Sequence, residues 1–149
     1  MRLLLTMCLG LFAVFGAIPT ATAYPEYGSI KSHRTLLFFA PSKDEKVEAF
    51  KRQMLIHGCQ MDDRDLHPLI LNIQDLADSR GLFTPEEILE MYDKYSVANE
   101  EHIAVLIGKD GTEKFRWHHN VDIEELVKVI DNMPMRRREM TRRVSRCSA

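Results

Sequence analysis

The sequence of 149 residues contains little of what most catalytic motifs require. It has seven glycines, and they form no glycine-rich loop of the kind that holds phosphate groups at the start of a helix. Its three cysteines lie at positions 8, 59 and 147, too far apart for a zinc motif. Internal repeats, low-complexity tracts and paired carboxylates at a recognisable catalytic spacing are also missing. These absences leave a protein without an evident phosphate-binding, zinc or acid–base motif.

Only one long apolar run occurs, and it lies at the N-terminus. Arg2 precedes the apolar segment Leu3–Ile18, and Ala21–Ala23 has the small-x-small pattern of a cleavage site. We predict that residues 1–23 form a secretory signal peptide that is cut before Tyr24. A membrane anchor is the alternative, but about 20 apolar residues are needed to cross a bilayer and this run ends early. We therefore expect a secreted product, extracellular or, in a bacterium, periplasmic, with no membrane span after the signal is removed.

Charge is unevenly distributed along the remaining chain. The segment Tyr24–Pro134 has 13 Lys and Arg against 21 Asp and Glu, a net charge of −8. The segment Met135–Ala149 has six Arg against one Glu, a net charge of +5. Such an asymmetric chain is typical of a domain with an interaction tail. We expect a flexible lead-in at 24–33, one domain at 34–140 and a basic tail at 141–149.

Four segments have the pattern of β-strands. Thr35–Ala40, Pro68–Ile73 and Ile103–Ile107 are short continuous apolar runs, which predict buried strands. Glu113–Trp117 alternates polar and apolar residues and predicts a half-exposed strand. Lys109–Gly111 contains Asp-Gly, which favours a two-residue hairpin turn before that strand.

Three helix starts are signalled by capping boxes. The segments Ser42–Glu45, Thr84–Glu87 and Asp122–Glu125 each place a capping residue three positions before a glutamate. The first helix is expected to run to about His57, with Gly58 at its C-terminal cap. The order strand, helix, strand, helix, strand, strand, helix predicts an α/β fold with a mixed sheet, as in the thioredoxin-like core.

A thioredoxin-like fold places a reactive cysteine at the start of its first helix, where the helix dipole stabilises the thiolate. Here that place is Ala40–Lys46, which contains no cysteine. The segment Asn99–Ile103, ahead of the third strand, contains no proline, although redox enzymes of this fold carry a cis-proline there. The usual routes of disulfide exchange and peroxide reduction are therefore not expected. We expect no cofactor.

Two cysteines remain after signal removal, and their pairing is open. Cys59 and Cys147 can form an intramolecular disulfide, pair with another chain to give a disulfide-linked dimer, or stay reduced. The alternative function is a thiol-dependent oxidoreductase using Cys59, with Cys147 as the resolving thiol. Cys59 follows the first helix, which is the wrong end for activation by the helix dipole.

Metal binding is weakly signalled. His118 and His119, with His102, are possible ligands, but adjacent residues of a strand point to opposite faces. Asp62–Asp65 lacks the spacing of a calcium loop. We predict no metal site.

The arginines near the C-terminus are the strongest candidates for binding. Guanidinium groups form multidentate contacts with sulfate, phosphate and carboxylate groups. We predict contact with a polyanion or an acidic extracellular partner rather than with nucleic acid, and we keep a solvated tail and proteolytic processing as alternatives. The candidate residues are Arg136, Arg137, Arg138, Arg142, Arg143 and Arg146.

Several segments together resemble a family. "LLFFAPSKDE", "MDDRDL", "VLIGKDGTEKFRW" and "VDIEELVKVIDNMPMRRREM" are similar to a secreted thioredoxin/peroxiredoxin-like domain of unknown function. This domain occurs in bacterial exported proteins and in animal sushi-repeat and coiled-coil-domain extracellular matrix proteins. The resemblance implies a non-catalytic domain that binds extracellular matrix or envelope components, and it carries over no catalytic residue. Residues that match its pattern are Arg64, Asp65, Lys109, Asp110, Gly111, Arg116, Pro134, Arg136 and Arg137. Arg136 and Arg137 are therefore expected to dock on acidic residues of the domain itself.

Overall fold

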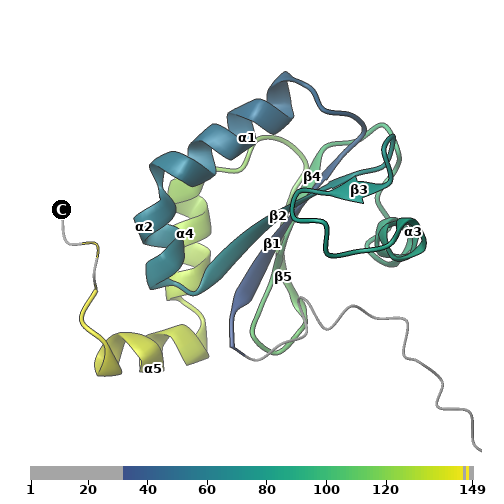
Figure 1. The fold of residues 1–149 in the computed structure, drawn as a ribbon. Helices are drawn as coiled ribbons and strands as arrows, with labels where there is room; N and C mark the ends of the chain where they lie inside the picture. The colour runs from purple at the N-terminus through teal and green to yellow at the C-terminus, as the bar shows by residue number, and fades with distance from the viewer. Residues whose placement is uncertain (1–31, 146, 148–149) are drawn as a thin grey trace, which may run out of the picture.

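A computed structural model describes residues 32–145 and 147. Their strands form one five-stranded sheet of order β3-β2-β1-β4-β5. β1 pairs in parallel with β2, and the β1–β4, β4–β5 and β2–β3 pairs are antiparallel. The expected α/β fold with a mixed sheet is confirmed (Figure 1). The elements are β1 (Arg34–Ala40), α1 (Glu45–Ile56), α2 (Gly58–Asp63), β2 (Leu66–Asn72), β3 (Ala77–Asp78), α3 (Pro85–Lys94), β4 (Ile103–Ile107), β5 (Glu113–Trp117), α4 (Ile123–Asp131) and α5 (Pro134–Arg142).

The sheet lies between two apolar clusters, because alternate residues of a strand point to opposite faces. On one face, Leu36 and Phe38 pack with side chains of α1, α2 and α4. On the other face, Leu37 and Phe39 pack with side chains of α3. Figure 1 shows α1 and α4 on one side of the sheet and α3 on the other. All seven residues of β1 are buried, which accounts for its nearly continuous apolar sequence.

The helix starts differ in detail from the capping boxes that the sequence suggests. Thr84 and Glu87 form the expected reciprocal box at α3. For α1, the prediction of Ser42 as cap is wrong, since Asp44 Oδ1 accepts hydrogen bonds from the Lys46 and Val47 amides. At α4, Asp122 caps the helix, while the carboxylate of Glu125 accepts a hydrogen bond from Trp117 Nε1.

Two turns also differ from the expectation. Gly58 does not close α1; it begins the short helix α2, and His57 is the C-cap. The β4–β5 turn is longer than a two-residue hairpin. The Gly111 amide donates to Gly108 O, and Gly111 then adopts a φ of 75°, which glycine reaches without steric cost. Lys109 and Asp110 are therefore the central residues of this turn.

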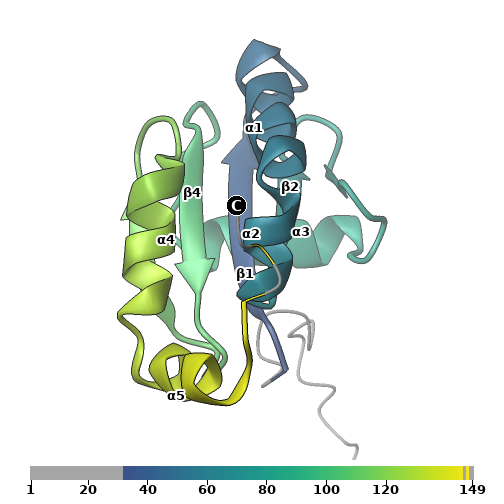
Figure 2. The ribbon, with the colours of Figure 1, turned by 90° about the vertical axis from the view of Figure 1, so that its left-hand side faces the viewer.

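The C-terminal part contains a further helix, α5, for which the sequence analysis gave no signal. Pro134 occupies the first turn of α5, a position where its missing N–H costs nothing. α5 lies across one end of the sheet, below α4 (Figure 2). α5 continues to Arg142, and Cys147 is bonded to Cys59 of α2.

The signal peptide expected at residues 1–23, and most of the expected lead-in at 24–33, lie outside the described residues. Within residues 32–145 and 147, none of the helices is both long and apolar enough to cross a membrane.

Candidate functional site

The position at the start of α1, where thiol enzymes with this fold carry a cysteine, is occupied by a carboxylate–imidazole pair. Asp44 Oδ2 lies 2.8 Å from Nε2 of His102, the residue just before β4. Burial disfavours the ionised form of Asp44, but hydrogen bonds from the Val47 amide and from His102 outweigh it and lower the pKa of Asp44. The positive end of α1 thus faces a carboxylate of the protein itself.

Three histidines line one cavity beside this pair. The cavity of about 480 Å³ is lined by His102, His118 and His119 together with Glu100 and Glu101, among others. The imidazole and carboxylate groups that line this cavity are groups that bind zinc in proteins. Across residues 32–145 and 147, however, no group of three or more His, Cys, Asp or Glu side chains is placed to hold a metal ion. The three histidines that the sequence suggested as possible metal ligands thus line the same cavity, but they are not placed to hold a metal ion together.

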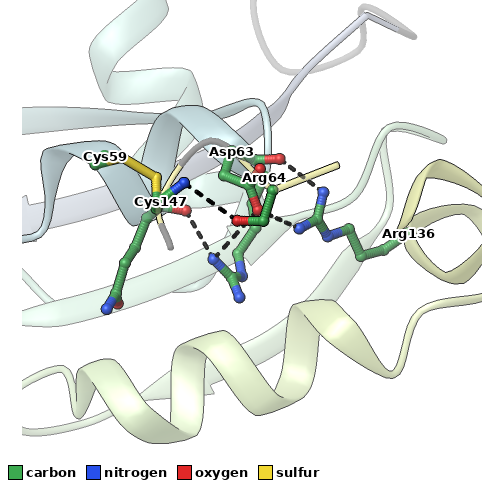
Figure 3. The surroundings of a disulfide bond; sticks show 7 residues. Cys59, Asp63, Arg64, Arg136 and Cys147 are labelled. Carbon is green, nitrogen blue, oxygen red and sulfur yellow. Dashed lines mark hydrogen bonds and ion pairs between the residues drawn. A yellow bond between two sulfur atoms is a disulfide. The ribbon is translucent and has the colours of Figure 1, made fainter. Parts of the chain in front are cut away.

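Ion pairs between α5 and α2 bury the first arginine of the basic segment. Arg136 is 4% exposed. Its NH2 lies 2.6 Å from Asp63 Oδ2, its NH1 donates to Asp63 O at 2.6 Å, and its Nε donates to Asp131 Oδ1 at 3.1 Å. Arg64 binds the same carboxylate of Asp131 through Nε and NH2, at 3.0 and 2.7 Å. Figure 3 shows Arg136 reaching from α5 toward the last turn of α2. Arg136 is therefore unavailable to a partner, contrary to its place among the candidate binding residues.

A second set of ion pairs fixes the next turn of α5. Glu139 lies between Arg34, whose NH1 and NH2 are 3.1 and 3.2 Å from its oxygens, and Lys109, whose Nζ is 2.8 Å away. Lys109 Nζ also donates to Asp65 Oδ2 at 2.7 Å. Burial disfavours the charged form of Glu139, but the bonds from Lys109 and Arg34 outweigh it and lower its pKa. Lys109 has the same effect on the pKa of Asp65. α5 is thus attached to the domain mainly by charged side chains.

The remaining arginines of the segment face outward. Arg137 is exposed, and its NH2 donates to the side-chain oxygen of Asn132 at 3.0 Å. The prediction that Arg137 docks on an acidic residue is therefore wrong for the part of the chain that the structure describes. Arg138 and Arg142 are exposed as well. Arg143 is 64% exposed and lies 3.3 Å from Asp65 Oδ1, so it is not detached from the domain. Arg146 lies outside the described residues.

A disulfide joins Cys59 of α2 to Cys147, with their Cα atoms 5.8 Å apart. Cys59 is exposed. The bond closes the chain segment that follows α5 onto α2, close to the Arg136–Asp63 contact (Figure 3). A neighbouring cavity of about 580 Å³ is lined by the two cysteines, by Asp62, Asp63 and Asp65, and by Arg143 and Val144.

Eight of the nine residues that match the family pattern fall into two groups, and the ninth, Arg137, is exposed on α5. Arg64, Asp65, Lys109 and Arg136 meet in the ion-pair network under α5. The others shape the backbone or its surface: Asp110 binds Thr112 and Lys114 in the β4–β5 turn, Gly111 provides its positive φ, Arg116 donates to Glu113 and to Tyr95 O, and Pro134 begins α5. The first group therefore docks α5 on the domain.

Sequence reasoning missed four members of the network: Arg34, Asp63, Asp131 and Glu139. One signal could have revealed Arg34. It directly precedes the apolar run of β1 and is 1% exposed, and a charge next to a buried strand must be paired. Glu139 is the single acidic residue among six arginines from Met135 on, and its inward position follows from its spacing of three from Arg136.

Comparison with known proteins identifies the family. Residues 29–139 match the family described as Domain of unknown function (DUF4174), and the chain belongs to this family. The structure is similar to the reduced crystal structure of Plasmodium vivax 2-Cys peroxiredoxin, with a TM-score of 0.52 and 13% sequence identity. The match covers 75% of this chain and 83% of the peroxiredoxin chain. Comparison with curated proteins gave no match. The thioredoxin-like fold is confirmed.

Proposed function

We propose that this member of the DUF4174 family is a secreted, non-catalytic thioredoxin-like domain. It binds acidic polymers or acidic proteins of the extracellular matrix or cell envelope through the outer face of α5. One observation carries the proposal: α5 turns Arg136 into the protein and leaves Arg137, Arg138 and Arg142 exposed. The signal-like pattern of residues 1–23 supports the expected location outside the cytoplasm.

The exposed arginines suit an extended anion. Arg138 and Arg142 are four residues apart on one helix, so they lie one turn apart, with Cβ atoms roughly 5–6 Å from each other. Guanidinium groups at this spacing can each hold a separate sulfate or carboxylate in bidentate geometry. The body of the chain has a net charge of −8 from Tyr24 to Pro134, so an anionic partner is repelled elsewhere and directed to α5.

A binding function also agrees with what occupies the usual catalytic position. At the start of α1 the Asp44 carboxylate holds the helix amides and His102, and residues 41–44 contain no thiol. The buried ion pairs of Arg136 and Glu139 hold α5 on the domain as a rigid platform as far as Glu139. A rigid platform lowers the entropy lost when a partner binds its outer face.

The test is retention on immobilised heparin, eluted with a salt gradient. We expect Arg138→Ala with Arg142→Ala to elute at lower salt than the wild type, because two charge contacts are removed. The matched control is Arg52→Ala with Lys128→Ala, which removes two exposed positive charges from α1 and α4 and should elute as the wild type does. Unchanged retention of the α5 variant, or an equal loss in the control, would contradict the proposal.

A second candidate is a thiol-dependent oxidoreductase using Cys59. The observation that favours it is the exposure of Cys59 together with its disulfide to Cys147, an arrangement that an attacking thiol can reach. Turnover of an insulin disulfide or of peroxide that disappears in Cys59→Ser would support this candidate. We expect no such turnover, because Cys59 lies after α1 and not at the start of that helix, where thiol enzymes of this fold carry their cysteine.

A further inference from the structure

Three places in the sequence have consecutive basic residues: Lys51–Arg52, Arg136–Arg138 and Arg142–Arg143. We propose that Arg142–Arg143 is a processing site for a dibasic-specific serine endoprotease. We further propose that the fragment cut off stays on the domain through the Cys59–Cys147 disulfide. This inference does not depend on which anion the outer face of α5 binds.

The first site is protected by its helix. Lys51 and Arg52 are exposed, but they lie in the middle of α1, between the buried side chains of Phe50 and Met54. A protease binds its substrate as an extended strand, so cleavage here requires α1 to unwind and to expose part of the core. Opening of this kind approaches the free energy of global unfolding.

The second site is protected by burial and by its helix. Arg136 is 4% exposed and is bound to Asp63 and Asp131. The amide of Arg137 donates to Met133 O within the first turn of α5. A protease that recognises Arg136–Arg137 or Arg137–Arg138 would have to break these ion pairs and unwind the helix from its start.

The third site lies where α5 ends. Arg143 is the C-cap, with an extended backbone of φ −124° and ψ 131°, and its amide makes the last helical hydrogen bond, to Glu139 O. Val144 is 92% exposed and Ser145 is exposed. For an endoprotease to bind across the Arg143–Val144 bond, the last turn of α5 has to fray and the contact between Arg143 and Asp65 has to open. Helix ends fray at little cost, and an exposed ion pair contributes little. Glu139, anchored by Arg34 and Lys109, holds the preceding turn in place.

The disulfide determines the fate of the product. Hydrolysis adds one water across the Arg143–Val144 peptide bond and leaves a carboxylate on Arg143 and an amino group on Val144. The fragment 144–149 contains Cys147, which remains bonded to Cys59. Arg137, Arg138 and Arg142 stay on α5. Release of the fragment therefore requires a second reaction, in which a dithiol reductant transfers two electrons to the disulfide and is itself oxidised to a disulfide.

The experiment treats the native protein with a dibasic-specific serine endoprotease and follows the intact mass with and without a reductant. We expect one cut that adds the mass of one water before reduction. After reduction, the mass should fall by that of residues 144–149. Cleavage after Arg143 should be at least about a hundredfold faster than after Arg52 or Arg138, because those cuts require helix opening.

Two variants define the result. Arg142→Ala with Arg143→Ala should abolish the cut, and Cys147→Ser should release the fragment without a reductant. A synthetic peptide of residues 138–149 shows that the enzyme amount used is sufficient. First cleavage after Arg52 or within Arg136–Arg138, or no cleavage of the native protein while the peptide is cut, would overturn the proposal. Loss of the fragment from the wild type before reduction would overturn its second part.

Discussion

Arg136 of α5 reaches Asp63 of α2 through two contacts, one from NH2 to Oδ2 and one from NH1 to the backbone oxygen, both of 2.6 Å. The two residues are 73 positions apart, so this pair joins the C-terminal helix to the end of the first αα segment. Asp131 of α4 binds the same guanidinium, and the three helices therefore meet at one buried cation. The folded protein is stable with these buried charges because each of them is paired, and removal of one partner is costly.

Replacement of Arg136 is expected to be strongly destabilising. Arg136→Ala removes the 2.6 Å contact with Asp63 and the 3.1 Å contact with Asp131 from a largely buried place. The loss of one member of a buried ion pair costs about 3–5 kcal/mol. The free energy of unfolding from urea titration measures the change. The neighbouring Arg137→Ala, at an exposed position, should change it by no more than about 0.5 kcal/mol. Equal effects of the two substitutions would show that the pair does not hold α5.

The stability should fall steeply in acid because folding lowers the pKa of Glu139 below its ordinary 4.5 and that of Asp65 below 3.8. For each group burial opposes ionisation, and the hydrogen bonds from Lys109 outweigh that effect. The unfolded chain thus binds more protons in this range. The contribution is complete above pH 4.5 and is lost as the pH falls through the two lowered values. Urea titrations at several acidic pH values measure the slope.

Glu139→Gln separates this effect from general acid unfolding. The variant should be less stable than the wild type at neutral pH, since Arg34 and Lys109 lose a charged partner. It should also lose less stability as the pH falls below 4.5. A slope equal to that of the wild type would assign the acid sensitivity to other carboxylates.

Much of the fold follows from local patterns in the sequence. The four expected strands are present, because a buried central strand needs a continuous apolar run and the β5 edge needs alternation. The Thr84 cap is present in full, since a threonine, a proline and a glutamate at fixed spacing have one local solution. These features depend on residues within a few positions of one another.

The features that were not predicted depend on distant residues. Ser42 and Asp44 both suit an N-cap, and His102, 58 positions away, also binds Asp44. α5 has a weak apolar face, so its helical state comes from ion pairs with Asp63, Arg34 and Lys109, which no local pattern reveals. The sequence indicates that the arginines are important. Which of them point into the protein and which point outward could be predicted only with the position of α2 known.

A pair of stacked histidines should add a pH dependence closer to neutrality. The rings of His33 and His67 lie 4.4 Å apart at 13°. Burial, the main cause, and then the charges of His67, Lys109 and Arg80 lower the pKa of His33, while Asp65 opposes the shift. Burial and then Arg80 lower the pKa of His67, against Asp62 and Asp65. The pKa values of both histidines in the folded protein lie below the ordinary 6.5. Below pH 6.5 the unfolded chain therefore binds more protons than the folded protein does, and the free energy of unfolding should decrease as the pH falls below 6.5.

His67→Phe tests the histidine pair, since it keeps an aromatic ring on His33 and removes one titrating group. We expect the variant to lose less stability than the wild type between about pH 7.5 and pH 5.5, a range below which the carboxylates dominate. Urea titration at the two pH values provides the comparison. A wild-type free energy of unfolding that does not change over this range would contradict the prediction.

Removal of the disulfide should destabilise the domain without unfolding it. Cys59 and Cys147 are separated by 88 positions, and closing a loop of that length in the unfolded chain corresponds to about 4–5 kcal/mol in the chain-entropy description. Measured losses for native disulfides are about 2–5 kcal/mol, so Cys147→Ser should lower the free energy of unfolding by an amount in that range. α5 should remain docked, because its ion pairs through Arg136 and Glu139 do not involve the disulfide.

Wild-type protein in a reductant should match Cys147→Ser in urea titration, and the oxidised wild type should run as a monomer on a non-reducing gel. A dimer band that disappears on reduction, with no stability lost in the variant, would mean that the two cysteines pair between chains.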